Sequence, residues 1–241
     1  MYGTENGKHN VILPYEKTDE IYIEPVTVKT SWFYRALKRT ADITFSLLVI
    51  IIFFVPSAVI AMCVKLTSKG PAFFLQERIG RDGVRFQIIK FRTMVTDAEK
   101  NGARWTLDDN DDRVTSLGRF LRKTRLDELP QFLNILSGHM TLIGPRPERA
   151  VFYEAFETYI HGFSERLKVK PGLTGYAQVY GGYKIPPEKK IIYDIEYVKN
   201  QSVWMDIKIF FKTIKVFFVG EKAKGTKTYE VFGANDSLQK G

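Results

Sequence analysis

Apolar residues in this chain are concentrated in one long run rather than spread evenly. Residues 43–64, which read ITFSLLVIIIFFVPSAVIAMCV, contain no charged side chain. An α-helix rises about 1.5 Å per residue, so a helix over this run would reach about 33 Å, whereas the hydrocarbon core of a bilayer is about 30 Å thick. The pattern therefore predicts a membrane segment, and with its flanks we expect a membrane anchor over residues 31–66.

A proline interrupts this run near its middle. A proline inside a helix removes one backbone hydrogen bond at a cost of roughly 3 kcal/mol, and lipid offers the freed carbonyl no water. Pro56 therefore predicts a break that ends the first half-helix near Val55. We expect the hydroxyl of the adjacent Ser57 to bond a carbonyl that the break exposes.

Basic residues flank the run on both sides. Lysine and arginine favour the cytoplasmic side of a membrane, so both ends of the segment are expected on that side. A hairpin that turns at Pro56 and Ser57 and leaves through the leaflet it entered satisfies both ends. We therefore predict a re-entrant membrane helix, and a kinked spanning helix is the alternative. The flanking residues are Arg35, Lys38 and Arg39 before the run and Lys65 and Lys69 after it.

A second apolar pattern occupies residues 202–219, SVWMDIKIFFKTIKVFFV, and residues 31–39 share its aromatic and basic character. Apolar residues at helical spacing, interrupted by lysines, are typical of a helix that lies in the interface of an anionic membrane. A core helix whose lysines extend to solvent fits the same spacing, so both interpretations stay open. The apolar positions are Val203, Ile207, Phe210, Ile214 and Phe217, and the lysines are Lys208, Lys212 and Lys215.

The remaining chain mixes short elements without regular alternation. Strand-like pieces such as RFQIIK, residues 85–90, are separated from helix-like pieces by glycine and proline turns. A regular strand–helix alternation, which a parallel sheet needs, is missing. We therefore predict a helix-rich, irregular α+β domain over residues 67–220, with a re-entrant membrane helix and interfacial amphipathic helices. An N-terminal tail over residues 1–30 and a polar C-terminal tail over residues 221–241 complete the expected organisation.

The charge of the chain points to an anionic partner. Its formal net charge is +9, which suits nucleic acid, anionic lipid or a phosphorylated substrate. No nucleic-acid-binding motif accompanies the charge, so we expect no nucleic acid among the partners. Lipid and a phosphorylated substrate remain.

Two adjacent carboxylates stand in the basic stretch LRKTRLDELPQFLNILSGHM, residues 121–140. Asp127 and Glu128 precede a proline and a predicted short helix, Gln131 to Leu136, that Gly138 closes. The helix dipole and nearby cations both favour an ionised Asp127. Such a carboxylate can hold Mg²⁺ or attack a phosphorus atom. An N-capping aspartate with a first-turn glutamate explains the same residues without any chemistry.

Two further basic elements favour the chemical interpretation. In Gly144-Pro145-Arg146-Pro147 the two prolines restrict the backbone on either side of one arginine, which presents a planar guanidinium suited to a diphosphate. Lys90 and Arg92 follow the predicted strand. Phosphoryl transfer needs cations that offset the diphosphate charge, a metal and a positioned nucleophile.

In their order and spacing, these segments resemble the bacterial sugar transferases, which are monotopic phosphoglycosyl transferases acting on polyprenyl phosphate. The resemblance covers roughly residues 38–216. Each motif alone is weak, but the ordered set is specific. The motifs are KRTADITFS, GPAFFLQERIGRDGVRFQIIKFRTM, DRVTSLGRFLRKTRLDELPQFLNILSGHMTLIGPRPE, KPGLTGYAQVYG and the closing pattern D-x-x-Y-V-x-N-x-S-x-x-x-D-I-K-I.

The resemblance implies an activity and a set of site residues. A sugar 1-phosphate would pass from a UDP-sugar to undecaprenyl phosphate, with release of UMP and with Mg²⁺ as cofactor. Asp127 would be the nucleophile of a covalent phosphosugar intermediate and a metal ligand, and Glu128 its catalytic partner. The residues expected to bind phosphate or support it electrostatically are Arg122, Arg146, Lys90 and Arg92.

The resemblance also implies a location and a pathway. The protein would lie in the bacterial inner membrane in contact with lipid, with its active site facing the cytoplasm, and would start the assembly of a capsule, exopolysaccharide or O-antigen. The alternative is a basic, membrane-bound interaction module whose site has lost its chemistry. The sequence leaves open whether the chain forms a homo-oligomer.

Overall fold

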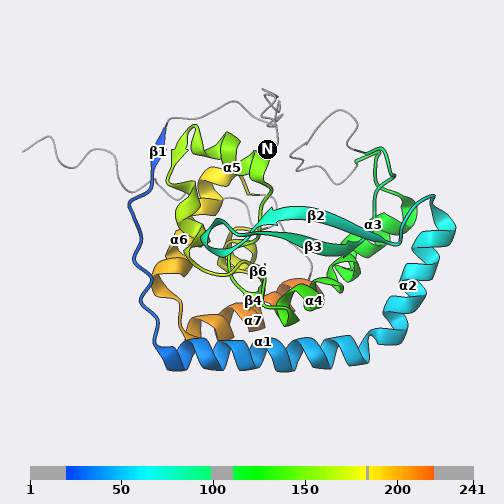
Figure 1. Ribbon diagram of the computed structural model, residues 1–241, viewed down its shortest axis with the longest axis horizontal. Coiled ribbons are helices and arrows are strands. Elements are labelled where there is room, and N and C mark those ends of the chain that lie inside the picture. The colour runs from blue at the N-terminus through cyan, green and yellow to red at the C-terminus, as the bar shows by residue number, and fades with distance from the viewer. Residues whose placement is uncertain (1–19, 99–110, 183–184, 220–241) are drawn as a thin grey trace, which may run out of the picture.

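The computed structural model describes residues 20–98, 111–182 and 185–219 (Figure 1). One long helix runs along one side of the molecule, and a body of short helices and strands lies against it. The helices are α1 (Trp32–Ile52), α2 (Phe54–Thr67), α3 (Ser116–Lys123), α4 (Gln131–Leu136), α5 (Ala150–Glu157), α6 (Pro187–Asn200) and α7 (Val203–Val219). The strands are β1 (Ile21–Tyr22), β2 (Phe73–Ile79), β3 (Arg85–Phe91), β4 (Thr141–Ile143), β5 (Ile160–His161) and β6 (Gly172–Thr174).

The strands of the described residues form separate two-stranded sheets. Strands β2 and β3 make an antiparallel hairpin, whereas β1 pairs with β5 and β4 with β6 in parallel. The hairpin turns through Asp82 and Gly83, whose φ angles of 55° and 80° lie in the left-handed region. The mixture of helices with small, unconnected sheets confirms the predicted α+β class, and β3 confirms the predicted RFQIIK strand.

The long apolar run forms two helices bent by 63°. The break lies at Phe53, where α1 ends and α2 begins, and not near Val55 as the sequence suggested. The physical reason is the reach of the proline: the ring of Pro56 clashes with the carbonyl four residues earlier, that of Ile52, and cannot donate to it. Pro56 itself lies in the first turn of α2, where a missing N–H costs little. Across the described residues, the Ser57 hydroxyl shows no hydrogen-bond partner, so the expected bond is not formed.

By length and composition, the bent pair α1–α2 is the part of the described chain that fits a membrane. No single described helix is both long and apolar enough to cross a bilayer alone. Large side chains along the pair are exposed, among them Leu48, Ile51, Phe54, Val55 and Leu66, with exposed fractions between 52% and 77%. An apolar surface of this extent is typical of an interaction with lipid or protein.

The basic residues at the start of α1 are bonded to the protein. Arg39 donates to the carbonyls of Ile135 and Leu136, both at 2.7 Å. It thus supplies hydrogen-bond donors to carbonyls that have no helical partner at the C-terminal end of α4. Lys38 forms an ion pair with Asp206 of α7 at 2.6 Å. Two of the flanking cations therefore hold α1 against the body, and the side of a membrane on which they lie stays a prediction.

The hydrophobic core places α4 between the β2–β3 hairpin and α1. Phe86 and Ile88 of β3 pack in one cluster with Phe132 and Ile135 of α4, and Phe45 of α1 joins them. A larger cluster, built from α5, α6 and the segment after β5, fills the other half of the body. Helix α1 thus forms one wall of the folded domain.

Helix α7 has one buried face and one exposed apolar face. Ile209 is fully buried in the core, and Phe210 packs against the same cluster. Other apolar side chains of the helix are exposed: Val203, Trp204, Ile207, Phe211 and Ile214. The side chain of Phe217 lies outside the described residues. One face of α7 is therefore a core face, and its apolar outer face suits an interface.

The segment that precedes α1 is packed against the body. Val26 is 3% exposed, donates through its N–H to Glu165 and accepts from Lys168 at 2.6 Å. Residues 20–30 therefore form an extended strap, where a tail was expected over residues 1–30. Residues 1–19 and the predicted C-terminal tail, 221–241, lie outside the described residues.

Candidate active site

Asp127 and Glu128 lie in a short 3₁₀ turn just before α4. The turn follows Arg125, whose φ of 57° reverses the chain after α3. Both carboxylates are 7% exposed. The helix that follows begins at Gln131 and ends before Gly138, as the sequence predicted.

Asn134 fixes this turn against the neighbouring strand β3. Its amide oxygen accepts from the N–H of Ile89 at 3.0 Å, and its amide nitrogen donates to the carbonyl of Gln87 at 2.7 Å. These bonds join α4 to β3 beside Lys90. Sequence reasoning missed Asn134, because a single asparagine within an amphipathic helix carries no distinguishing pattern.

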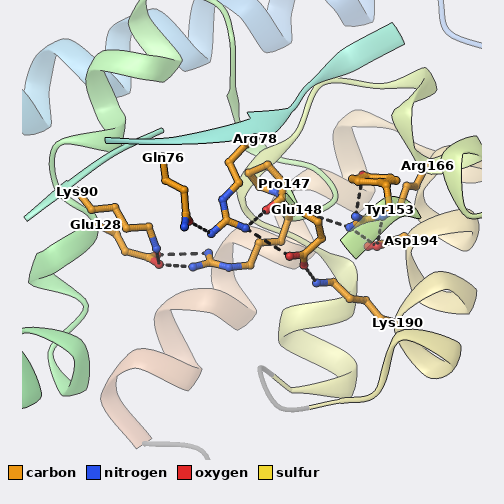
Figure 2. A network of polar contacts seen from close by, with 11 residues as sticks. Gln76, Arg78, Lys90, Glu128, Pro147, Glu148, Tyr153, Arg166, Lys190 and Asp194 are labelled. Atoms are coloured by element: carbon orange, nitrogen blue, oxygen red, sulfur yellow. Dashed lines mark hydrogen bonds and ion pairs between the residues drawn. The ribbon is translucent and has the colours of Figure 1, made fainter. Parts of the chain in front are cut away.

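Glu128 is the point at which the basic elements meet. Its carboxylate pairs with Lys90 of β3 at 3.2 Å and with the guanidinium of Arg146 from the loop after β4. Figure 2 shows Lys90 and Glu128 directed toward each other from separate elements. Burial alone would raise the pKa of Glu128, but Arg146 and Lys90 outweigh it and hold this pKa well below its usual range. The paired cations therefore favour the ionised form of Glu128.

Asp127 differs from its neighbour. Burial, followed by the charge of Glu128, raises its pKa to about 6, although Lys90, Arg146 and Arg122 act in the opposite direction. The sequence argument expected the helix dipole and nearby cations to favour ionisation of Asp127. The structure differs because Asp127 is buried, and because Glu128 lies beside it and takes the close ion pairs with Lys90 and Arg146.

Arg122 and Arg92 occupy different places. Arg122 donates to the Thr93 hydroxyl at 2.9 Å, and its charge acts on Asp127. Arg92 is 6% exposed and donates to the carbonyl and hydroxyl of Ser68 at 2.8 Å and 2.7 Å. Arg92 therefore caps the C-terminal end of α2, and its expected contact with phosphate is not supported by this position. The structure brings together the other predicted residues: Lys90, Arg122, Asp127, Glu128 and Arg146.

A second set of polar and charged residues adjoins this site and was missed from the sequence. It connects the hairpin, the loop after β4 and α6 through hydrogen bonds and ion pairs (Figure 2). Buried charged residues at isolated positions give no periodic signal, so only the fold reveals them. Its members are Gln76, Arg78, Glu148, Tyr153, Arg166, Lys190 and Asp194.

The donor set suits Mg²⁺ only in combination with a substrate. Within the described ranges, no three His, Cys, Asp or Glu side chains are placed to share a metal ion. Glu128 is engaged by two cations, which leaves Asp127 as the carboxylate of the pair open to a metal. Mg²⁺ commonly binds through one or two carboxylates with water and substrate phosphates. The residues present fit that mode.

The chemistry available here is phosphoryl transfer. A buried carboxylate can act as a nucleophile, and the adjacent cations can offset the charge of a diphosphate. Lys90 and Arg146 are 19% and 21% exposed at their side chains, so both can be reached by a ligand. The site therefore combines a buried carboxylate with cations that a ligand can reach.

Comparison with known proteins agrees with this chemistry. The family model for the bacterial sugar transferases matches residues 33–220. An Aeromonas hydrophila protein named UDP-N-acetylgalactosamine-undecaprenyl-phosphate N-acetylgalactosaminephosphotransferase is 42% identical over 194 residues, which are 79% of this chain and 46% of that protein.

Two further relatives carry other sugars in their names. The UDP-glucose:undecaprenyl-phosphate glucose-1-phosphate transferase of Escherichia coli is 43% identical over 195 residues, 78% of this chain and 42% of its own. The undecaprenyl-phosphate galactose phosphotransferase of Salmonella typhimurium is 40% identical over 197 residues, 76% of this chain and 40% of its own. The chain thus spans less than half the length of these three relatives.

Proposed function

Because the chain belongs to the bacterial sugar transferase family, we propose that it transfers a sugar 1-phosphate from a UDP-sugar to undecaprenyl phosphate and releases UMP. The relatives named above share undecaprenyl phosphate as the acceptor and differ in the sugar. The observation that carries the proposal is the buried Asp127 beside a Glu128 that is paired with Lys90 and Arg146. The transfer would initiate the synthesis of a polysaccharide or glycoconjugate.

The proposed reaction has two displacement steps. A carboxylate oxygen of Asp127 attacks the β-phosphorus of the UDP-sugar, and the bond from this phosphorus to the bridging oxygen breaks. UMP leaves with the electron pair, and the phosphosugar stays on Asp127. A phosphate oxygen of undecaprenyl phosphate then attacks the same phosphorus, which breaks the bond to Asp127 and regenerates its carboxylate.

The neighbouring residues support these steps by charge and position. Arg146 and Lys90 would bind the diphosphate, and their ion pairs with Glu128 would hold both side chains in place. Arg122 adds a third cation near Asp127. Asp127 would hold Mg²⁺ together with the substrate, and the ion would help to offset the negative charge that develops on the leaving UMP.

We also propose that α1 and α2 form a re-entrant hairpin in the inner membrane, with the site on the cytoplasmic side. The support is the 63° bend within an apolar run, together with the exposed apolar face of α7. An acceptor with a lipid tail and a water-soluble donor would then meet at the interface.

A topology experiment tests this location. Lys29 and Lys69 are exposed and lie on either side of the hairpin. In a Cys63→Ala background, Lys29→Cys and Lys69→Cys should both resist a membrane-impermeant thiol reagent added to intact cells. Labelling of one position without the other would indicate a spanning helix.

The activity is tested by UMP release and by intact-protein mass. With a panel of UDP-sugars and no acceptor, the wild type should gain the mass of one phosphosugar, and Asp127→Asn should gain none. Asp82→Asn, in the exposed hairpin turn, is the matched control and should behave like the wild type. UDP binding without UMP release or an adduct, for every sugar in the panel, would favour an interaction module over an enzyme.

A further inference from the structure

The loop that carries Arg146 is fixed along its whole backbone. The carbonyls of four consecutive residues, 145 to 148, each accept a hydrogen bond at 2.8–3.2 Å. Two donors are backbone N–H groups of neighbouring strands, and two are guanidinium groups. In order along the loop, the donors are Gly172, Arg166, Arg78 and Ile79.

The guanidinium bound to the carbonyl of Arg146 is itself held in place. Arg166 is 1% exposed and pairs with Asp194 at 2.6 Å. It also donates to the hydroxyl of Tyr153 at 3.0 Å. Arg166 is therefore a fixed donor beneath the loop, because its charge and its N–H groups are matched by buried partners.

The guanidinium bound to the carbonyl of Pro147 depends on Glu148. Arg78 approaches the carboxylate of Glu148 at 3.4 Å and donates to the amide oxygen of Gln76 at 2.6 Å. The other carboxylate oxygen of Glu148 pairs with Lys190 of α6. Figure 2 shows Glu148 between Arg78 and Lys190, with Arg78 directed toward the loop. Glu148, at the end of the loop, thus joins the β2–β3 hairpin to α6.

Glu148 is ionised in this position. Burial would raise its pKa, but Lys190 and Arg78 more than compensate, and the pKa lies below its usual range. Loss of its charge would leave two cations in a buried space with no carboxylate between them, which is strongly unfavourable. Arg78 would then lose the group that directs it to the carbonyl of Pro147.

We propose that Glu148 is a positioning residue for Arg146, which it orients through Arg78 and the backbone of Pro147. Glu148 makes no contact with the diphosphate in this arrangement, and it acts by keeping the arginine loop in its binding conformation. The inference rests on the proposed function, in which Arg146 binds the diphosphate of the donor. Preorganisation of this kind saves ordering free energy on binding.

A double-mutant cycle on UDP binding tests the proposal. The dissociation constant of UDP, with Mg²⁺, is measured by calorimetry for wild type, Glu148→Gln, Arg146→Ala and the double variant. We expect Glu148→Gln alone to weaken binding about tenfold, and to change it less than about twofold when Arg146 is already alanine. A residue that acts through Arg146 has nothing left to orient once that side chain is gone.

Two further variants keep the test decisive. Asp206→Asn removes another paired carboxylate, which is partly buried, and any effect it has on UDP binding should be equal in both backgrounds. If Glu148→Gln does not fold, Glu148→Asp keeps the charge, shortens the side chain and should show the same dependence on Arg146.

The possible results are distinct. Wild-type UDP binding in Glu148→Gln, or an equal loss in both backgrounds, overturns the positioning role. If Arg146→Ala itself leaves UDP binding unchanged, the proposed contact of Arg146 with the diphosphate is wrong. That result would count against the proposed function as well as against the positioning role of Glu148.

Discussion

The carboxylate of Glu128 pairs with the guanidinium of Arg146, although the turn before α4 and the loop after β4 are separate segments of the chain. The same carboxylate also receives Lys90 from β3. One acid thus joins three elements at the candidate site. Because its pKa is held far below neutrality, Glu128 is suited to positioning cations and not to accepting a proton.

Replacement of Glu128 by Gln should separate binding from turnover. Arg146 and Lys90 remain and lose a competing anion, so we expect the UDP dissociation constant to stay within about threefold of wild type. Their positions are no longer fixed, so UMP release should slow at least about tenfold. Steady-state kinetics with UDP titrations measure both quantities.

The control for this variant is Glu77→Gln. Glu77 forms an exposed pair with Arg85 at 2.9 Å on the same hairpin, so its loss should leave UMP release within about twofold. Weaker UDP binding with an unchanged turnover rate in Glu128→Gln would contradict the positioning role.

Asp127→Asn should stabilise the metal-free protein near neutral pH. The pKa of Asp127 rises from 3.8 to about 6 on folding, so between these values the folded protein holds a proton that the unfolded chain has lost. The free energy of unfolding of the wild type therefore falls as pH rises through this window. Above it, the variant should be more stable by roughly 1–3 kcal/mol.

Denaturant unfolding of the two proteins at about pH 3.5 and about pH 7.5 checks this sign. The difference should be small at the lower pH, where the aspartic acid is neutral in the folded protein and mostly neutral in the unfolded chain. Asp82→Asn should change the free energy of unfolding by less than about 0.5 kcal/mol. A wild type that is the more stable protein at pH 7.5 would rule out a raised pKa.

Pro56→Ala should straighten the bent helix pair. The substitution restores a donor for the carbonyl of Ile52 and removes the ring clash. For spin labels at the exposed positions Leu37 and Leu66, a helix rise of 1.5 Å per residue and the 63° bend give a lengthening of about 6 Å.

Pulsed electron paramagnetic resonance in lipid nanodiscs measures this distance, with Cys63 replaced by Ala. Val55→Ala, at an exposed neighbouring position, is the control and should leave the distance unchanged. An unchanged distance in Pro56→Ala would mean that packing of α2 against the body, and not the proline, sets the bend.

Arg39→Gln should destabilise the fold. Its guanidinium makes two bonds of 2.7 Å to the last carbonyls of α4, and hydrogen bonds to charged groups contribute about 1.5–3 kcal/mol. We expect a loss of roughly 1–3 kcal/mol in the free energy of unfolding. Arg35→Gln, at an exposed position one turn earlier on α1, should cost less than about 0.5 kcal/mol. Equal effects of both substitutions would show that Arg39 does not act as a cap.

Local patterns in the sequence predicted the elements closest to the chemistry. The alternation in RFQIIK gave strand β3, and the proline and glycine around residues 130–138 gave α4 with its bounds. These signals depend only on neighbouring residues, and so one sequence is enough to read them. Lys90, Asp127, Glu128 and Arg146 were singled out from local residue patterns and, with Arg122, from the family resemblance. The structure places these five residues close together, and their roles stay predictions.

Other features depend on contacts between distant segments, which a single sequence does not reveal. Arg92 has the same residue type and local setting as a phosphate ligand, yet the end of α2 lies within its reach and binds it. Likewise, nothing near Glu148 in the chain points to Lys190, forty-two residues later. The predicted position of the helix break was wrong for another reason. The ring of a proline clashes with the carbonyl four residues before it, so the break lies at Phe53 and not next to Pro56.

The bonds that Arg39 and Asp42 make have a mechanical consequence. Asp42 is 3% exposed and accepts from the hydroxyl of Thr141 and the N–H of Leu142, at the strand that leads to Arg146. With Arg39 at the end of α4, helix α1 is bonded both to the helix that follows Asp127 and to the strand that precedes Arg146. If that helix lies in a bilayer as proposed, a change in lipid thickness that tilts α1 moves Asp127 and Arg146 together, and the lipid becomes a control on catalysis.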